Sequence, residues 1–269
     1  MPHISLAAEK LTSFSGFPIT NSLLTTWLVM GLLFLLAYLS THSLSLVPSG
    51  IQSMAEIVIG GLYEFFESVI GHHVKLVFPL LASLFLFIIL ANWVGLLPGV
   101  GTVGFFRSGT KNEAHVEESK TNVSVSEVEE KKEFVPLLRG ATADLNTTLA
   151  LAVFSVIAMQ FYGFHVLGPH YGGRFLDFRS PIYFFVGILE VISDTSKIIS
   201  FAFRLFGNIF AGEVLLAVMA FLMPFIIPLP FLMLELFVGF VQALVFSMLT
   251  AVFVNVALSH GEGEAHAHA

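Results

Sequence analysis

The sequence contains no cysteine and little charge: 12% of its 269 residues are charged, against roughly 25% in a soluble domain. The absence of cysteine excludes disulfides, thiolate metal ligands and cysteine nucleophiles. The net charge of −7 disfavours nucleic-acid binding, which needs a basic face. Residues 1–20 lack the basic start, apolar core and cleavage site of a signal peptide, so we expect the first apolar helix to direct insertion. Hydrophobic residues make up 56% of the chain, which is typical of an integral membrane protein.

Motifs for covalent chemistry are also missing. The sequence has no glycine-rich phosphate loop, nucleophile elbow, metalloprotease helix or internal repeat. We therefore expect a protein that is not itself an enzyme, with no catalytic residue, no cofactor and no metal. The His-rich tail 260–269 could offer imidazole ligands, but it lies beyond the last apolar run, and we expect it to be solvated and disordered.

Long apolar runs dominate the rest of the chain. They cover residues 23–46, 76–100, 147–167, 181–191, 198–223 and 225–258. Since about 20 apolar residues span a bilayer as a helix, these runs predict five or six membrane helices. Continuous apolar runs without strict alternation disfavour a β-barrel. The predicted fold is therefore an all-α integral membrane protein.

The remaining segments divide the chain further. We expect an extramembrane segment at 1–22, two membrane helices within 23–100, a charged extramembrane loop at 101–143, and further membrane helices at 144–259 that end in a long, tilted hairpin, 182–259. Within the loop, residues 107–139 are the most hydrophilic and are predicted to be solvated and mobile.

Residues 51–70 carry apolar side chains at helical spacing with glutamates on other faces. This pattern predicts an amphipathic helix lying in the membrane interface, although a helix packed against the bundle has the same pattern. Basic residues bear on orientation: the loop 107–139 holds six Lys or Arg, and the short loop 169–180 holds two. Because charges in short loops near span ends are the most reliable guide, we expect the short loop on the cytoplasmic side.

Arg204 stands inside the apolar run 198–223, where arginine costs about 2.5 to 3.5 kcal/mol at the bilayer centre. A side chain that reaches the headgroups from a helix end would avoid this cost. The neighbouring polar residues instead favour an ion pathway. At 100° per residue, one helix face carries Glu190, Asp194, Lys197, Arg204, Asn208 and Ala211, with Ser200 beside it. Glu213 lies about half a turn out of phase with Arg204 and is expected to face other surroundings.

The last apolar run contains Glu235 and Gln242, seven residues apart on one face. Pro224 and two further prolines mark a turn before it. In an antiparallel hairpin folded there, Gln242 lies near the level of Arg204, and Glu235 near the level of Glu213. The two acids would lie roughly 10 to 13 Å from the arginine layer along the helices. Because two carboxylates in a poorly solvated pocket cannot both ionise without a large cost, we expect the pair to titrate as a unit.

These motifs resemble subunit a of the F-type ATP synthase. The resemblance runs from about residue 23 to 256 and is most specific in Arg204-Leu-Phe-Gly-Asn208, Ala211-Gly-Glu213 and Val241-Gln242-Ala-Leu-Val-Phe-Ser. It is supported by Asn92 near the end of the second span and by Thr142-Ala-Asp144-Leu-Asn. Two departures are Ile198, where the family often has proline, and the length of the loop 107–139.

The resemblance implies a stator subunit with two proton half-channels that couples proton translocation to rotation of a ring of c subunits. It assigns Arg204 as the essential arginine with Asn208 and Gln242 as neighbours, and Glu213 and Glu235 to the half-channel from the outside. Glu190, Lys197, Ser200 and Asp144 are secondary pathway candidates, Glu190 near the inner exit.

The resemblance implies as partners the c-subunit ring, the b-subunit peripheral stalk, the other ATP synthase subunits and the lipid bilayer. It places the chain in a bacterial inner membrane. A self-contained ion channel or secondary antiporter is the alternative, and it predicts transport by this chain alone. A structural anchor is a second alternative, and it predicts that the intramembrane charges can be replaced by apolar residues.

Overall fold

The computed structural model describes residues 10–14, 17–42, 45, 50–97, 100, 103–108, 132–168, 170–173, 181–223 and 226–267. Within these residues five helical segments are long and apolar enough to cross a membrane, which confirms the predicted all-α membrane fold. The chain is therefore a multi-pass membrane protein. The long helices are α1 (Asn21–Thr41), α2 (Ile51–Ile70), α3 (Val74–Gly95), α4 (Leu145–Leu167), α6 (Pro181–Leu222) and α7 (Pro228–Ala267).

Side-chain caps explain where two of these helices begin. Thr20 accepts a hydrogen bond from the Leu23 backbone N–H at the start of α1, at 3.3 Å. Asp144 does the same for Asn146 at the start of α4, at 3.1 Å. Both residues satisfy donors that a helix leaves without an intrahelical partner, so the start of each helix follows from the local sequence.

Helix α2 is separated from α3 by Gly71, whose φ of 65° favours glycine, and by the short helix η1 (Gly71–His73). Its second half packs on the bundle, with Phe66 completely buried. Its first half presents apolar side chains outward, including Met54 at 71% exposure. Each of the two interpretations of residues 51–70 thus describes one half of α2. The position of α2 in the membrane interface remains a prediction.

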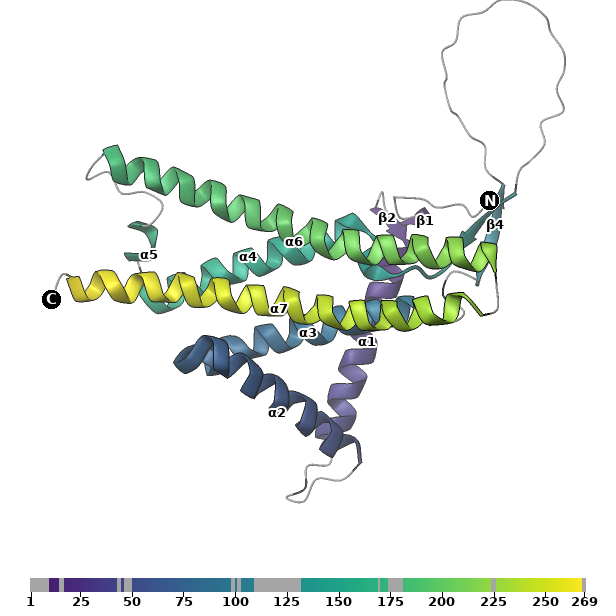
Figure 1. Cartoon of the computed structure of the whole chain (residues 1–269), viewed down its shortest axis with the longest axis horizontal. Coiled ribbons are helices and arrows are strands. Elements are labelled where there is room, and N and C mark those ends of the chain that lie inside the picture. The colour runs from purple at the N-terminus through teal and green to yellow at the C-terminus, as the bar shows by residue number, and fades with distance from the viewer. Residues whose placement is uncertain are drawn as a thin grey trace, which may run out of the picture.

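The runs 181–191 and 198–223 form one continuous helix, α6, of 42 residues. At 1.5 Å per residue α6 is about 63 Å long, well beyond the roughly 30 Å hydrocarbon core. A helix of this length must tilt or project beyond the membrane. In Figure 1, α3, α4, α6 and α7 run side by side while α1 crosses them, which is consistent with a hairpin steeply inclined to the first span.

The C-terminal tail differs from its prediction. Helix α7 continues through residues 260–267, which we expected to be disordered, and residues 268–269 lie outside the described part. Extending an existing helix adds one hydrogen bond per residue without a new nucleus, so two glycines do not end it. Helix α6 ends at Leu222 and α7 begins at Pro228, which agrees with a turn near Pro224, a residue outside the described part.

Two antiparallel hairpins were not predicted. Strands β1 (Lys10–Phe14) and β2 (Phe17–Thr20) pair before α1, and β4 (Gly104–Ser108) pairs with β5 (Lys132–Pro136). The charged loop is therefore ordered at both ends, and its middle, 109–131, lies outside the described residues. After β5 the chain turns inward through η2 (Ala141–Ala143), whose three residues are all buried. The prediction of a solvated loop is thus wrong for its C-terminal end.

The α6–α7 hairpin is held against the bundle by a core of small and aromatic residues. Phe201, Ala202 and Leu205 of α6 are at most 3% exposed and pack with Ala243 and Phe246 of α7. Helix α7 also packs along α3, and α6 along α4. The remaining face of α6 points away from this core, and it carries Arg204.

Candidate functional site

Arg204 lies on the outer face of the hairpin. Its neighbours Ala202 and Leu205 are fully buried, whereas Phe203 is 56% exposed and Arg204 itself is exposed. The guanidinium Nη2 donates to the Ser200 hydroxyl one turn earlier, at 3.4 Å. In a membrane this exposed cation needs a further partner, because a charge facing lipid is costly.

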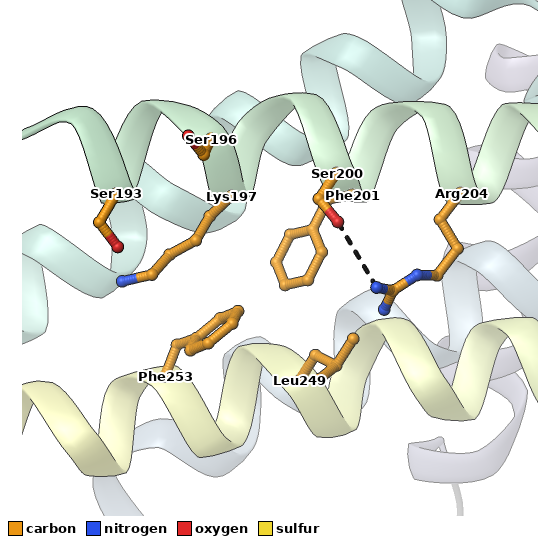
Figure 2. Close-up of a pocket in the computed structure, with 8 residues that line it drawn as sticks. All are labelled: Ser193, Ser196, Lys197, Ser200, Phe201, Arg204, Leu249 and Phe253. Carbon is orange, nitrogen blue, oxygen red and sulfur yellow. Dashed lines mark hydrogen bonds between the residues drawn. The ribbon is translucent and has the colours of Figure 1, made fainter.

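A cavity of about 320 Å³ opens beside Arg204 between α6 and α7. Figure 2 shows its lining: α6 supplies three serines, both cations and one aromatic ring, and α7 supplies Leu249 and Phe253. The α6 residues are Ser193, Ser196, Lys197, Ser200, Phe201 and Arg204. The serine hydroxyl groups can form hydrogen bonds to water, and the two α7 side chains form an apolar wall. The cavity extends from Arg204 toward the start of α6.

Asn208 and Gln242 join the two helices on the other side of Arg204. The Asn208 amide donates to the Gln242 side-chain oxygen at 2.6 Å. Arg204 was the predicted neighbour at the level of Gln242, so Gln242 lies about one turn further along α6 than expected. The Gln242 amide nitrogen is buried and has no hydrogen-bond acceptor among the described residues.

Glu235 and Glu213 are placed near each other one or two turns beyond Asn208. Glu235 is only 5% exposed, and its carboxyl group lies against Gly212, where an added Cβ would overlap it. The Glu213 side chain is 43% exposed. One acid is therefore enclosed between the helices while its neighbour remains accessible to solvent, as a route from water into the hairpin requires.

Arg139 is the cation of this second group. It lies between β5 and η2, is 8% exposed, and its Nε is 3.4 Å from Glu213 Oε1. Its Nη2 is also 3.5 Å from Glu213 Oε2. A partly buried arginine thus holds the more accessible of the two acids. No sequence signal marked Arg139 apart from its position at the end of the charged loop.

Asp144 occupies a different environment from the two glutamates. It is 4% exposed, caps α4, and accepts a hydrogen bond from the Ser22 hydroxyl at 2.8 Å. Nearby, Thr142 donates to Asn92 at 2.6 Å, and Asn92 donates to the Gly239 carbonyl at 3.0 Å. These bonds tie α1, α3, α4 and α7 together, so Asp144 has a clear structural role.

Lys197 and Asp194 form the third charged group, near the start of the cavity. Lys197 Nζ lies 2.6 Å from Asp194 Oδ1 and 4.8 Å from the centre of the Phe253 ring. Glu190, one turn before Asp194, is half-buried and takes part in a further interaction. The structure therefore separates Glu190, Lys197 and Ser200 from Glu213 and Glu235, with Arg204 between the two sets.

Comparison with known proteins identifies the family. A family model described as ATP synthase A chain matches residues 23–255. ATP synthase subunit a of Geotalea uraniireducens is 33% identical over 239 residues, covering 88% of this chain and 86% of that protein. The Syntrophobacter fumaroxidans subunit a is 31% identical over 256 residues, covering 94% and 90%. The chain belongs to the ATP synthase subunit a family.

Membership of the subunit a family makes this chain a membrane subunit of ATP synthase, with the other subunits of that complex as partners. The matched segment includes the whole α6–α7 site, from Glu190 to Gln242. Two residues of the matched segment, Arg139 and Asp194, were not among the candidate site residues. Asp194 was recognised as part of the polar helix face, but its pairing depends on the fold of α4 and α5.

Proposed function

We propose that this subunit a provides two proton half-channels separated by Arg204, and that it couples proton movement to rotation of a ring of c subunits. The observation that carries the proposal is the place of Arg204: exposed on the outer face of the hairpin, between two groups of polar residues. About 13 Å of helix separates Arg204 from Glu213, and about 16 Å separates it from Ser193.

On the uptake side, Glu213 is the accessible proton acceptor and Glu235 the enclosed one. Arg139 holds Glu213 in place, and the close approach at Gly212 holds Glu235. Protons then reach the outer face of α6 near the hydrogen-bonded pair Asn208 and Gln242. Asp144 contributes by shaping this side, since its oxygens already accept bonds from Ser22 and Asn146.

On the release side, protons leave through the cavity that runs from Arg204 past three serines. Serine hydroxyls both donate and accept, so they can order a chain of water molecules. Glu190 lies near the far end of this path. The Lys197 ammonium is held beside Phe253, away from the arginine.

Arg204 separates the two sides because its guanidinium stays protonated and cannot relay a proton. It repels protons that approach directly, and it favours the ionised form of a rotor carboxylate brought against it. Ions therefore cross only when carried by the ring. This chain binds no nucleotide in the proposal: ATP chemistry resides in other subunits, and a b-subunit stalk holds the stator. The bacterial relatives favour a bacterial inner membrane.

The test replaces Arg204 by alanine in the whole complex in inverted membrane vesicles. ATP-driven acidification and passive proton leak are recorded on the same vesicles, and subunit assembly is checked by immunoblot. We expect acidification to be lost, with an added leak, while the complex remains assembled. Arg107→Ala, which makes the same change on strand β4, is the control and should pump normally. Normal pumping by Arg204→Ala would reject the proposal.

A further inference from the structure

We propose, on the basis of the function above, that Asp194 is a positioning residue that neutralises the charge of Lys197 on the proton-release path and holds the ammonium away from Arg204. Two charged residues line the release cavity, Lys197 and Arg204, and both are cations. Asp194 does not line the cavity but bonds one of them. The proposal therefore concerns the net charge of the residues along the release path. The α6 motif that carries the family resemblance does not include Asp194.

A chain of hydrogen bonds fixes the Asp194 carboxylate. The Tyr171 hydroxyl donates to Gln160 Oε1 at 2.8 Å, and Gln160 Nε2 donates to Asp194 Oδ2 at 2.5 Å. Lys197 Nζ then donates to Asp194 Oδ1 at 2.6 Å. Each carboxylate oxygen thus has its own donor, and because Tyr171 occupies the Gln160 oxygen, the Gln160 amide group faces the acid.

The residues of this hydrogen-bond chain come from three helices, and two of them, Tyr171 and Asp194, are buried, while Gln160 and Lys197 are partly buried. Tyr171 in α5 (His170–Gly173) is 3% exposed and Asp194 is 7% exposed. The Tyr171 ring packs so closely on Gly163 of α4 that a side chain there would overlap it. A charged pair with this many fixed partners has a single geometry, unlike an exposed pair whose side chains move freely.

The geometry directs Lys197 away from the arginine. Figure 2 shows the Lys197 side chain pointing back along α6 toward Ser193, with the Phe201 ring between it and Arg204 in this view. Asp194 lies one turn earlier on the same helix, so the ion pair pulls the ammonium in this direction. Without Asp194, the ammonium would be an uncompensated cation in a partly enclosed space, where charge interactions are stronger than in water.

An uncompensated cation on the release path opposes protons that leave through it. Removing Asp194 alone should therefore slow release, and removing Lys197 alone should leave an uncompensated carboxylate that attracts the leaving protons. Removing both charges should be less harmful than removing either. A broken buried ion pair also lowers stability, and replacing both partners can restore it. Rates per assembled complex are therefore needed to separate an effect on release from a loss of stability.

The experiment measures ATP-driven acidification in vesicles that hold the whole complex, for Asp194→Asn, Lys197→Gln and the double variant. Rates are divided by the amount of assembled complex. We expect both single variants to pump more slowly than the unaltered chain and the double variant to exceed each by at least about threefold. Glu64→Gln, which removes an exposed acid from α2, is the matched control for charge and should be unchanged.

If Asp194→Asn does not assemble, the comparison of Lys197→Gln with the double variant still decides. A double variant no faster than Lys197→Gln overturns the proposal. Arg204→Ala measured in parallel separates the two hypotheses. Lost pumping in Arg204→Ala together with no rescue in the double variant overturns only the role of Asp194. Normal pumping in Arg204→Ala overturns the half-channel function itself.

Discussion

Arg139 and Glu213 form an ion pair on the proposed uptake side. The guanidinium is almost buried, and its partner remains 43% exposed. Replacing Arg139 by glutamine leaves Glu213 without its cation and the uptake group without a fixed geometry. Because the pair is intermediate between a surface and a buried salt bridge, we expect ATP-driven acidification to fall about three- to tenfold. Passive leak should stay unchanged, since Arg204 is intact.

The control for this change is Arg107→Gln, the same substitution on strand β4. Acidification and leak are measured on vesicles with equal amounts of assembled complex. Equal pumping by the Arg139 and Arg107 variants would show that proton uptake does not depend on the Arg139–Glu213 pair. A leak in the Arg139 variant would show that the arginine acts as a second barrier, which the proposed mechanism excludes.

Single residues differed in how far the sequence could predict them. The spacing of Glu235 and Gln242 and the turn near Pro224 predicted which α6 residues they approach, and the Asn208–Gln242 bond lies within one turn of that prediction. Arg139 could not be found in this way. Its partner is 74 residues away, and the pairing depends on a hairpin and a buried turn that carry no hydrophobic periodicity.

At the scale of elements, α6 and α7 approach each other closely at Gly212. A Cβ at this position would overlap the Glu235 carboxyl group. Gly212→Ala should therefore displace Glu235 or separate the helices, at a cost of about 1 to 3 kcal/mol for overpacking. We expect proton uptake to slow more than assembly declines, measured as acidification per assembled complex.

Gly60→Ala in α2 is the matched control, because nothing lies within 4 Å of a Cβ built there. Alanine also has the higher helix propensity, so the control isolates the steric effect from the backbone effect. Pumping by Gly212→Ala at the control rate would mean that the Glu235 carboxyl group can move without loss of function. That result would remove Glu235 from the uptake path as proposed.

Elements were predicted well where hydrophobic length decides and poorly where it does not. Apolar runs indicated the spans and left five or six helices open, while the polar face from Glu190 to Ala211 and the hairpin at 182–259 indicated the one continuous helix observed as α6. The polar interval at 192–197 stays helical because Asp194 and Lys197 satisfy each other and Gln160. The two hairpins escaped prediction because an isolated two-stranded pair is only marginally stable, and because β4 and β5 lie at opposite ends of the charged loop.

At the scale of the whole molecule, the exposed position of Arg204 indicates that this chain does not function alone. The bundle core faces the other side of α6, and the surface around Arg204 includes exposed Phe203 and Asn208. Because lipid tails offer a guanidinium no hydrogen-bond acceptor, we predict that another subunit covers this surface in the membrane. In the proposed mechanism, the two half-channels meet only through that partner.

The chain alone should therefore conduct no protons. We expect the purified chain in liposomes, under an imposed membrane potential, to show the same proton flux as empty liposomes. The whole complex in the same lipids should acidify them when ATP is supplied, which verifies the preparation. Proton flux through the chain alone that disappears in Glu235→Gln would favour the self-contained channel instead. If the chain alone carries no proton flux, the path is complete only when a partner carboxylate reaches Arg204.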